Sequence, residues 1–135
     1  MIYGIPSADA RGYSGIVEPW LSVVVDRFDP GFTTNDIISG IEEQRYQLWL
    51  IAPNSEPVAA IVTEINNYPQ YSVLHAPYIG GSRMNEWFDN AFDVLEAFAK
   101  YHGCKYLTGC GRRGWIKQGA SRGYQEVYTV VRKEI

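Results

Sequence analysis

Residues 80–109 read GGSRMNEWFDNAFDVLEAFAKYHGCKYLTG, and this segment decides the fold. Core-type residues recur in it at three- and four-residue steps, the pattern of a helix with one broad buried face. They are Met84, Phe88, Phe92, Leu95, Ala99 and His102, with Trp87, Ala91, Val94, Phe98 and Tyr101 beside them. Ser82 is a suitable N-cap and Gly103 a suitable residue after the last turn. The segment therefore predicts a helix of about 20 residues, roughly 30 Å long.

Short β-prone runs lie on both sides of this helix, at Tyr71–His75 and Lys105–Gly109. A helix that joins two neighbouring strands most simply forms a right-handed crossover, and the strands it joins are parallel. The sequence thus predicts a βαβ unit around residues 84–101.

The N-terminal third predicts one strand and two helices. Ile2–Ile5 is a short strand at a sheet edge, stopped by Pro6. A helix is expected to open at Glu18–Pro19, because proline suits the first turn, and to end at 29–31. A second helix is expected from Thr33 or Thr34, with a hydroxyl cap and Asp36 in the first turn.

Two clear strands follow at 47–52 and 58–65, joined by a Pro- and Asn-containing loop of hairpin length, so they should pair antiparallel. After the Lys105–Gly109 strand we expect a short helix over 115–122 and a last strand over Gln125–Val131. The order β-α-α-β-β-β-α-β-α-β predicts an α+β domain over residues 1–135, a mixed sheet with helices on both faces.

Composition limits the function. A net charge of −3 and a pI near 5.3 argue against nucleic acid as a partner, because affinity for phosphate backbones comes from an excess of Lys and Arg. No apolar run is long enough for a membrane span, and no signal peptide is recognisable, so the expected location is the cytoplasm. The two cysteines are expected to be free, and no histidine pair has metal-ligand spacing.

The chain resembles the GNAT superfamily of N-acetyltransferases in the order, length and spacing of these elements. The residues that carry the resemblance are Tyr71–Gly81 before the long helix, His102–Leu107 at its end and Gly123–Tyr124 after the short helix. From Gly111–Trp115 to Gly123–Tyr124 the chain also loosely resembles small GNAT-like proteins encoded by tailed phages. A phage-encoded protein would act in the host cell or in the virion.

The resemblance implies acetyl-CoA as cofactor. It would be held by the end of the strand before the long helix and by the loop that follows, where free N–H groups at a helix N-terminus favour a pyrophosphate. The residues at these positions are Leu74, His75, Ala76, Gly80, Gly81, Ser82, Arg83 and Met84. Pro77 stands where the family places a basic or amide residue. A tight turn that needs a positive φ is the competing interpretation of the glycine pair.

The resemblance also implies a base for the attacking amine and an acid for the leaving thiolate. Glu64 and His75 are the candidate bases. Gly119 occupies the place of the family's tyrosine, and Tyr124 is the candidate substitute. Each residue also has an ordinary interpretation: a solvated carboxylate, a structural histidine and a core ring.

Two functions remain open. The first is an acyl-CoA-dependent N-acyltransferase that acts on an amine the sequence does not identify. The second is a non-catalytic phage virion or host-interaction protein that retains the fold, with a protein partner or a second copy. The ten Tyr, four Trp and five Phe suit such an interface. Arg112–Arg113 is the strongest local basic cluster and could contact phosphate or an acidic surface.

Overall fold

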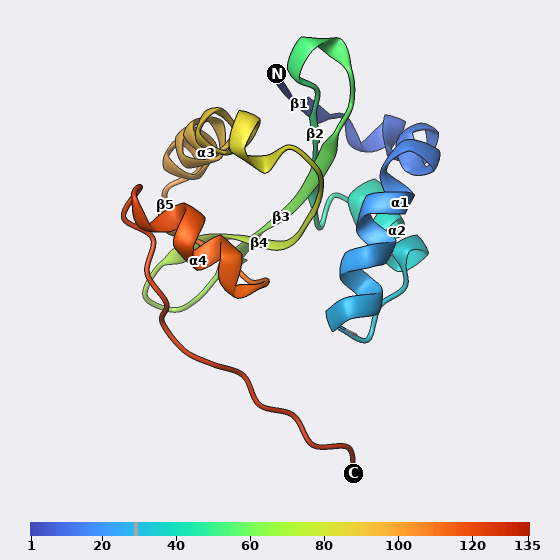
Figure 1. The fold of residues 1–135 in the computed structure, drawn as a ribbon. Helices are drawn as coiled ribbons and strands as arrows, with labels where there is room; N and C mark the ends of the chain where they lie inside the picture. The colour runs from blue at the N-terminus through green and yellow to red at the C-terminus, as the bar shows by residue number, and fades with distance from the viewer. Residues whose placement is uncertain (29) are drawn as a thin grey trace.

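The computed structural model describes residues 1–28 and 30–135 and contains one five-stranded sheet in the order β1-β2-β3-β4-β5 (Figure 1). All neighbouring strands are antiparallel except β4 and β5, which are parallel. Their bounds are β1 Ile2–Ile5, β2 Gln47–Ile51, β3 Ala59–Asn67, β4 Ser72–Gly81 and β5 Cys104–Gly109. This arrangement confirms the predicted α+β mixed sheet and its parallel crossover.

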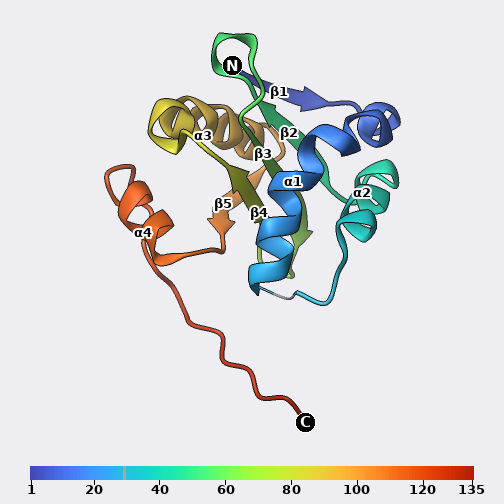
Figure 2. The same ribbon diagram turned by 45° about the vertical axis from the view of Figure 1, so that its right-hand side comes forward.

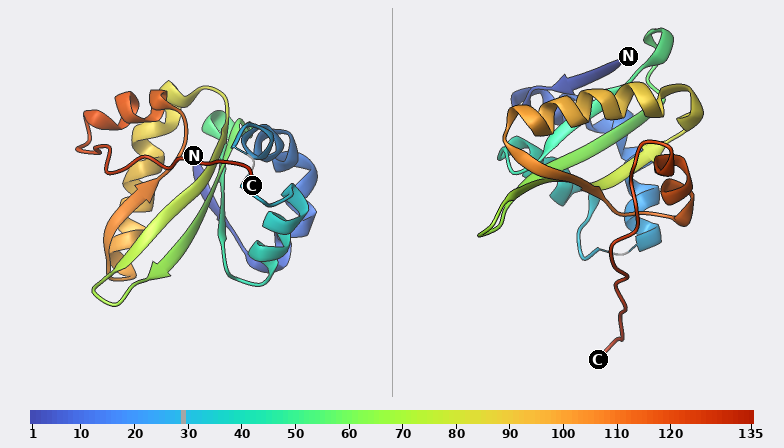
Figure 3. Two further views of the ribbon diagram at one scale, coloured as in Figure 1. Left: turned by 90° about the horizontal axis from the view of Figure 1, so that it is seen from below. Right: turned by 90° about the vertical axis from the view of Figure 1, so that its left-hand side faces the viewer.

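The four α-helices of the described residues lie in two layers, one on each face of the sheet (Figures 2 and 3). They are α1 Ala10–Phe28, α2 Thr34–Glu42, α3 Met84–Tyr101 and α4 Arg113–Ala120, with short 3-10 turns η1 Ser7–Asp9 and η2 Pro53–Ser55. None of the described helices combines the length and the apolarity needed to cross a bilayer.

Strand alternation divides the core between the two layers. Leu48 and Leu50 pack with α1 and α2, whereas Trp49 and Ile51 pack with α3. The two early helices therefore lie on the face opposite α3, which confirms the predicted sheet with helices on both faces.

The N-terminus of α2 is capped by the hydroxyl residue that the sequence predicts. Thr33 accepts a hydrogen bond from the Asp36 N–H at 3.1 Å, and the Asp36 carboxylate accepts one from the Thr33 N–H at 2.8 Å. This reciprocal capping box satisfies backbone donors that the first turn leaves free. Gly40 is needed in this helix because a Cβ there would lie 2.5 Å from the ring of Tyr46.

Helix α1 is longer than expected: it begins at Ala10, and Pro19 lies in its interior. The prediction of a start at Glu18–Pro19 was wrong, because buried Ala10 and Val17 extend the apolar face backward and outweigh the missing proline N–H. Asp29, which the sequence placed in the helix stop, lies outside the described residues.

Helix α3 matches its prediction in length, and Gly103 follows it with φ +72°. Its N-terminus differs: Arg83, at φ 59°, is the cap residue, and no side chain caps the first turn. Ser82 instead continues the sheet, since its N–H donates to the Val58 carbonyl at 3.0 Å and its carbonyl accepts the Trp87 indole N–H at 2.8 Å. Tyr101 and His102, expected in the buried stripe, are exposed.

Strand β4 continues past the predicted end at His75 to Gly81, so Gly80 and Gly81 belong to a strand and not to a loop. It contains a bulge, because Glu64 pairs with His75 but Val62 pairs with Tyr78. Ala76 and Pro77 thus face the single residue Thr63. The extra residue turns Tyr78 toward α1, although Leu74 and Ala76 face α3.

The expected last strand over Gln125–Val131 is not formed. Residues 124–135 have no assigned secondary structure and run away from the body as an extended segment (Figure 1). Residues 125–131 have strand propensity, but no strand of the described chain pairs with them.

We predict that Gly81→Ala destabilises the fold by about 2 kcal/mol or more. Gly81 has φ +131°, and a Cβ there would overlap the backbone of Val58 and Ala59 in β3. Chemical denaturation measures the effect. Gly15→Ala in α1 is the matched control, because a Cβ there meets nothing within 4 Å, and it should be neutral or stabilising. Equal effects of the two changes would contradict this explanation.

Candidate functional site

Strands β4 and β5 separate halfway along β4. Their pairing ends at Ala76 and Gly109, whereas β4 continues for five more residues against β3. The Ser82 N–H donates to β3, and the backbone N–H and C=O groups of successive strand residues point to alternate sides of the strand. The backbone groups of Pro77 and Ile79 therefore face the gap between β4 and β5. The Pro77 carbonyl accepts a weak hydrogen bond from the Cys110 thiol, with Sγ 3.5 Å from the oxygen.

A hollow of about 210 Å³ lies beside the second half of β4. Helix α1 contributes Trp20 and Arg27, α3 contributes Met84 and Trp87, and the segment after β5 contributes Cys110, Gly111, Arg112 and Trp115. Among the described lining residues the charged ones are Arg27 and Arg112, both cations. The hollow therefore suits an anionic ligand with apolar or ring-bearing parts.

The structure brings only some of the expected cofactor residues to this hollow. Gly80, Gly81 and Met84 line it, whereas Ser82 and Arg83 are not among its lining residues. Arg83 instead lies 3.6 Å from Glu86 and 4.0 Å from Glu56. Leu74 and Ala76 are fully buried and pair with β5, so neither offers a free side chain.

The glycine pair has packing reasons of its own. A Cβ on Gly80 would lie 2.5 Å from the carbonyl oxygen of Trp20 in α1, and one on Gly81 would overlap β3. The two glycines thus allow β4 to lie close to its neighbours. A substitution at either position would disturb the packing of the fold, so a loss of binding in such a variant is no evidence for contact with a ligand.

Glu64, His75 and Tyr78 share the α1 face of the sheet, next to the separation of the strands. Glu64 and His75 are direct cross-strand partners, and Val62, one pair further along that face, is opposite Tyr78. The His75 Nδ1 is 2.7 Å from the Thr108 hydroxyl on β5. The two candidate bases are therefore neighbours, on a half-exposed part of the sheet.

Burial and the Glu64 charge set the protonation of this cluster. Burial lowers the pKa of His75, which outweighs the opposing effect of Glu64 and favours the neutral imidazole. Burial, then Tyr46, Glu64 and Cys110, raise the pKa of Tyr78 to about 12, so it keeps its proton at neutral pH. Burial and Glu64 also raise the pKa of the Cys110 thiol, which disfavours a thiolate nucleophile.

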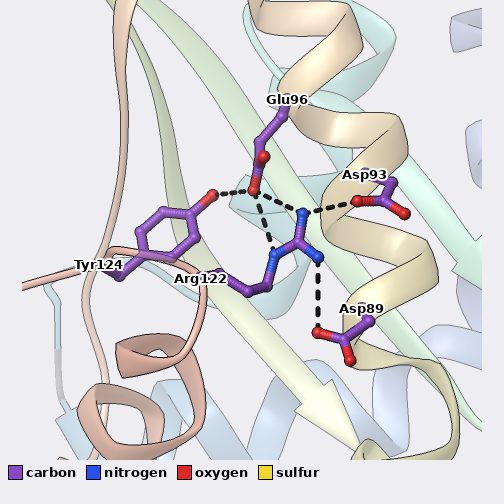
Figure 4. A network of polar contacts seen from close by, with 5 residues as sticks. All are labelled: Asp89, Asp93, Glu96, Arg122 and Tyr124. Atoms are coloured by element: carbon purple, nitrogen blue, oxygen red, sulfur yellow. Dashed lines mark hydrogen bonds and ion pairs between the residues drawn. The ribbon is translucent and has the colours of Figure 1, made fainter.

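Tyr124 lies on the other side of the sheet. Its hydroxyl donates to Glu96 at 2.7 Å and its ring meets Phe92 edge-on, both in α3 (Figure 4). Burial and the bond to Glu96 raise its pKa. Tyr124 is thus not brought to Glu64 and His75 in this structure.

Arg122 completes the Tyr124 contact. Its guanidinium lies 2.7 Å from Asp93, 2.9 Å from Glu96 and 3.5 Å from Asp89 (Figure 4). These carboxylates follow one another at three- and four-residue steps along α3 and would repel one another without the cation. The cluster fastens the end of α4 to α3, which is a structural role.

Sequence reasoning did not select Tyr78 as a site residue. Its position two residues before the glycine pair is evident in the sequence. The face of the sheet on which its side chain lies depends on the bulge at Ala76–Pro77, which no alternation pattern reveals. Arg27 was not selected either, because it is far from the glycine pair and from β5 in the chain.

The described residues hold no group of three or more His, Cys, Asp and Glu side chains that could bind a metal ion. A second, open hollow of about 510 Å³ lies where α1 and α2 meet, lined by Val25, Asp26, Phe32, Thr33 and Thr34, and it contains none of the expected site residues.

The fold matches solved acetyltransferase structures over the whole chain. A ribosomal-protein-alanine N-acetyltransferase from Brucella melitensis superimposes with a TM-score of 0.72 at 11% identity, covering 100% of this chain and 99% of the other. A predicted acetyltransferase with acetyl-CoA from Clostridium acetobutylicum gives 0.71 at 11% identity, covering 99% and 95%. A GNAT family acetyltransferase from Staphylococcus aureus gives 0.64 at 14% identity, covering 100% and 98%.

The chain has the fold of the GNAT acetyltransferases. The sequence itself matches no family model and no curated protein. With identities this low, the likeness establishes the GNAT fold, and function must be argued from the site.

The depressed pKa of His75 in this GNAT fold predicts a pH effect on stability. Between the folded pKa and 6.5 the unfolded chain binds a proton that the folded chain does not, so stability falls as pH drops below 6.5. His75→Gln should flatten this slope, measured by chemical denaturation across the acid range. His102→Gln, at the exposed end of α3, controls for the loss of an imidazole. An unchanged slope in His75→Gln would contradict the prediction.

Proposed function

We propose that this protein is an acyl-CoA-dependent N-acyltransferase that transfers an acetyl group to an amine. The observation that carries the proposal is the hollow at the separation of β4 and β5, with Arg27 and Arg112 in its wall. Cys110 lines that hollow and also lies within electrostatic reach of Glu64 and Tyr78, so the hollow adjoins the polar cluster.

The hollow fits the chemistry of acetyl-CoA in its charge and its rings. Phosphates are anions that guanidinium groups bind well, and the partly exposed Trp20 and Trp115 offer apolar and stacking surface. The backbone of Ile79 faces the gap and can bond an amide-bearing arm. The basic residue of the family's loop is absent, and Arg27 and Arg112 would supply the positive charge from other elements.

Bound acetyl-CoA would supply a thioester carbonyl for attack by the amine. The neutral imidazole of His75, or Glu64 beside it, accepts the proton that the amine nitrogen loses as the N–C bond forms. Tyr78 keeps its proton at neutral pH and donates a hydrogen bond to the sulfur as the C–S bond breaks. The roles of these three residues rest on their common face beside the gap.

Other parts of the functional prediction remain predictions. The acceptor amine is unidentified, and the cytoplasmic location and the phage origin rest on the sequence alone. The interaction protein remains the second candidate. One observation favours it: the exposed rings of Tyr68, Tyr71 and Tyr106 lie together. The ring centroids of Tyr68 and Tyr71 are 6.4 Å apart, and those of Tyr71 and Tyr106 are 5.1 Å apart.

We predict that the protein binds acetyl-CoA and that Arg112→Glu weakens binding at least about tenfold, because a cation in the wall becomes an anion that repels phosphate. Isothermal titration calorimetry measures the affinity. Arg113→Glu is the matched control: it is the next residue, exposed and outside the lining, and it makes the same change of net charge. No binding by the unmodified protein would overturn the acyltransferase proposal and leave the interaction protein in its place.

We predict that Glu64→Gln lowers turnover by about 10²-fold or more without changing the affinity for acetyl-CoA, because the proposed role of Glu64 is to accept a proton from the amine and its side chain does not line the hollow. Release of the free thiol from acetyl-CoA, followed over a panel of amines, measures turnover. Glu43→Gln, an exposed carboxylate at the end of α2, is the control. Full activity of Glu64→Gln would remove Glu64 from the mechanism and leave His75 as the base.

A further inference from the structure

The outer edge of β5 is unpaired in the described chain. β5 lies at the end of the sheet order, with β4 on one side only. Its six residues make it longer than β1, the four-residue strand at the opposite edge. An open edge presents a row of free N–H and C=O groups to any extended segment.

Residues 125–131 have the composition of a strand but pair with no strand of the described chain. Residues 127–131 read VYTVV, a β-branched and aromatic run of the kind that strands prefer. Val127, Tyr128, Val130 and Val131 are 78–89% exposed. Within the segment the structure records a hydrogen bond from the Thr129 hydroxyl to Glu126 at 3.3 Å. An apolar strand of this length is costly to leave in water.

The segment begins at a fixed point and leaves the body from there. Tyr124 is held by its bond to Glu96, by its ring contact with Phe92 and by its N–H, which donates to the Gly119 carbonyl at 3.1 Å. Beyond it the chain extends outward and does not return (Figures 1 and 3). The segment is thereby presented to a neighbouring molecule.

We infer that residues 125–131 of one copy add as a strand to the outer edge of β5 in a second copy, and the reverse. The same edge serves both copies under two-fold symmetry, so each exposed strand and each open edge is satisfied by one reciprocal contact. Two exposed rings belong to this edge of the sheet, Tyr71 (40%) and Tyr106 (47%), packed edge-on at 5.1 Å. Apolar side chains of the added strand would cover them.

Proline substitutions in the segment test this pairing. The variant Val127→Pro/Val130→Pro removes two backbone N–H donors that point to opposite sides of an extended strand. Whichever side of the strand pairs with β5, one of these donors would belong to the ladder. Neither change disturbs the body, because the segment is exposed there. Sedimentation equilibrium should show a dimer for the unmodified chain and at least about tenfold weaker dimerisation for the variant. Glu134→Pro, beyond the paired stretch, is the matched control and should dimerise normally.

Hydrogen exchange locates the contact. Amides of 104–109 should exchange slowly in the dimer and faster in the double-proline variant, with α3 unchanged. A monomeric unmodified chain would overturn the inference, since pairing within one copy leaves no dimer. A dimer that the prolines leave intact, or one without altered exchange in β5, would overturn it equally. None of these results depends on acetyl-CoA binding or turnover.

Discussion

The bulge at Ala76–Pro77 is the constraint on which the rest of this structure depends. One extra residue in β4 reverses the facing of every residue after it, so Tyr78 joins the α1 layer whereas Ala76 belongs to the α3 layer. Pro77 has no N–H to donate, and the pairing of β4 with β5 ends at the residue before it. The same local irregularity therefore opens the gap between the strands and turns a phenol toward Glu64 and His75.

The two faces of the sheet differ in how their polar groups are stabilised. On the α1 side, Glu64 influences His75, Tyr46, Tyr78 and Cys110, and burial keeps each of these four groups in its neutral form more strongly than in water. On the α3 side, the charges pair with one another: Arg122 holds three carboxylates and Tyr124 shares one of them. A largely buried neutral cluster around one partly exposed carboxylate suits proton transfer, whereas an ion-pair network suits the fastening of α4 to α3.

The glycine pair shows how one sequence feature can serve a purpose other than the expected one. Gly80 and Gly81 resemble a phosphate loop in sequence, yet they lie in β4 and permit close contact with α1 and β3. The positive charge that a phosphate ligand requires lies instead on α1 and on the segment after β5, at Arg27 and Arg112. Neither position is near the glycine pair in the chain. The packing of α1 against β4 brings Arg27 to the hollow, and the path of the chain after β5 brings Arg112 there.

The sequence by itself determined the elements whose signals are local. The α3 stripe, the Thr33–Asp36 capping box, the turn between β2 and β3 and Gly103 after α3 are each decided by residues within a few positions of one another. Their order was enough to predict the mixed sheet and to place Glu64 and His75 on adjacent strands. Tertiary structure decided what depends on distant partners. Packing carries α1 through Pro19, the bulge selects the side of Tyr78, and Tyr124 follows α3 away from the predicted site. Residues 125–131 have strand propensity, but a strand exists only where another strand supplies its hydrogen bonds, and the described chain supplies none there.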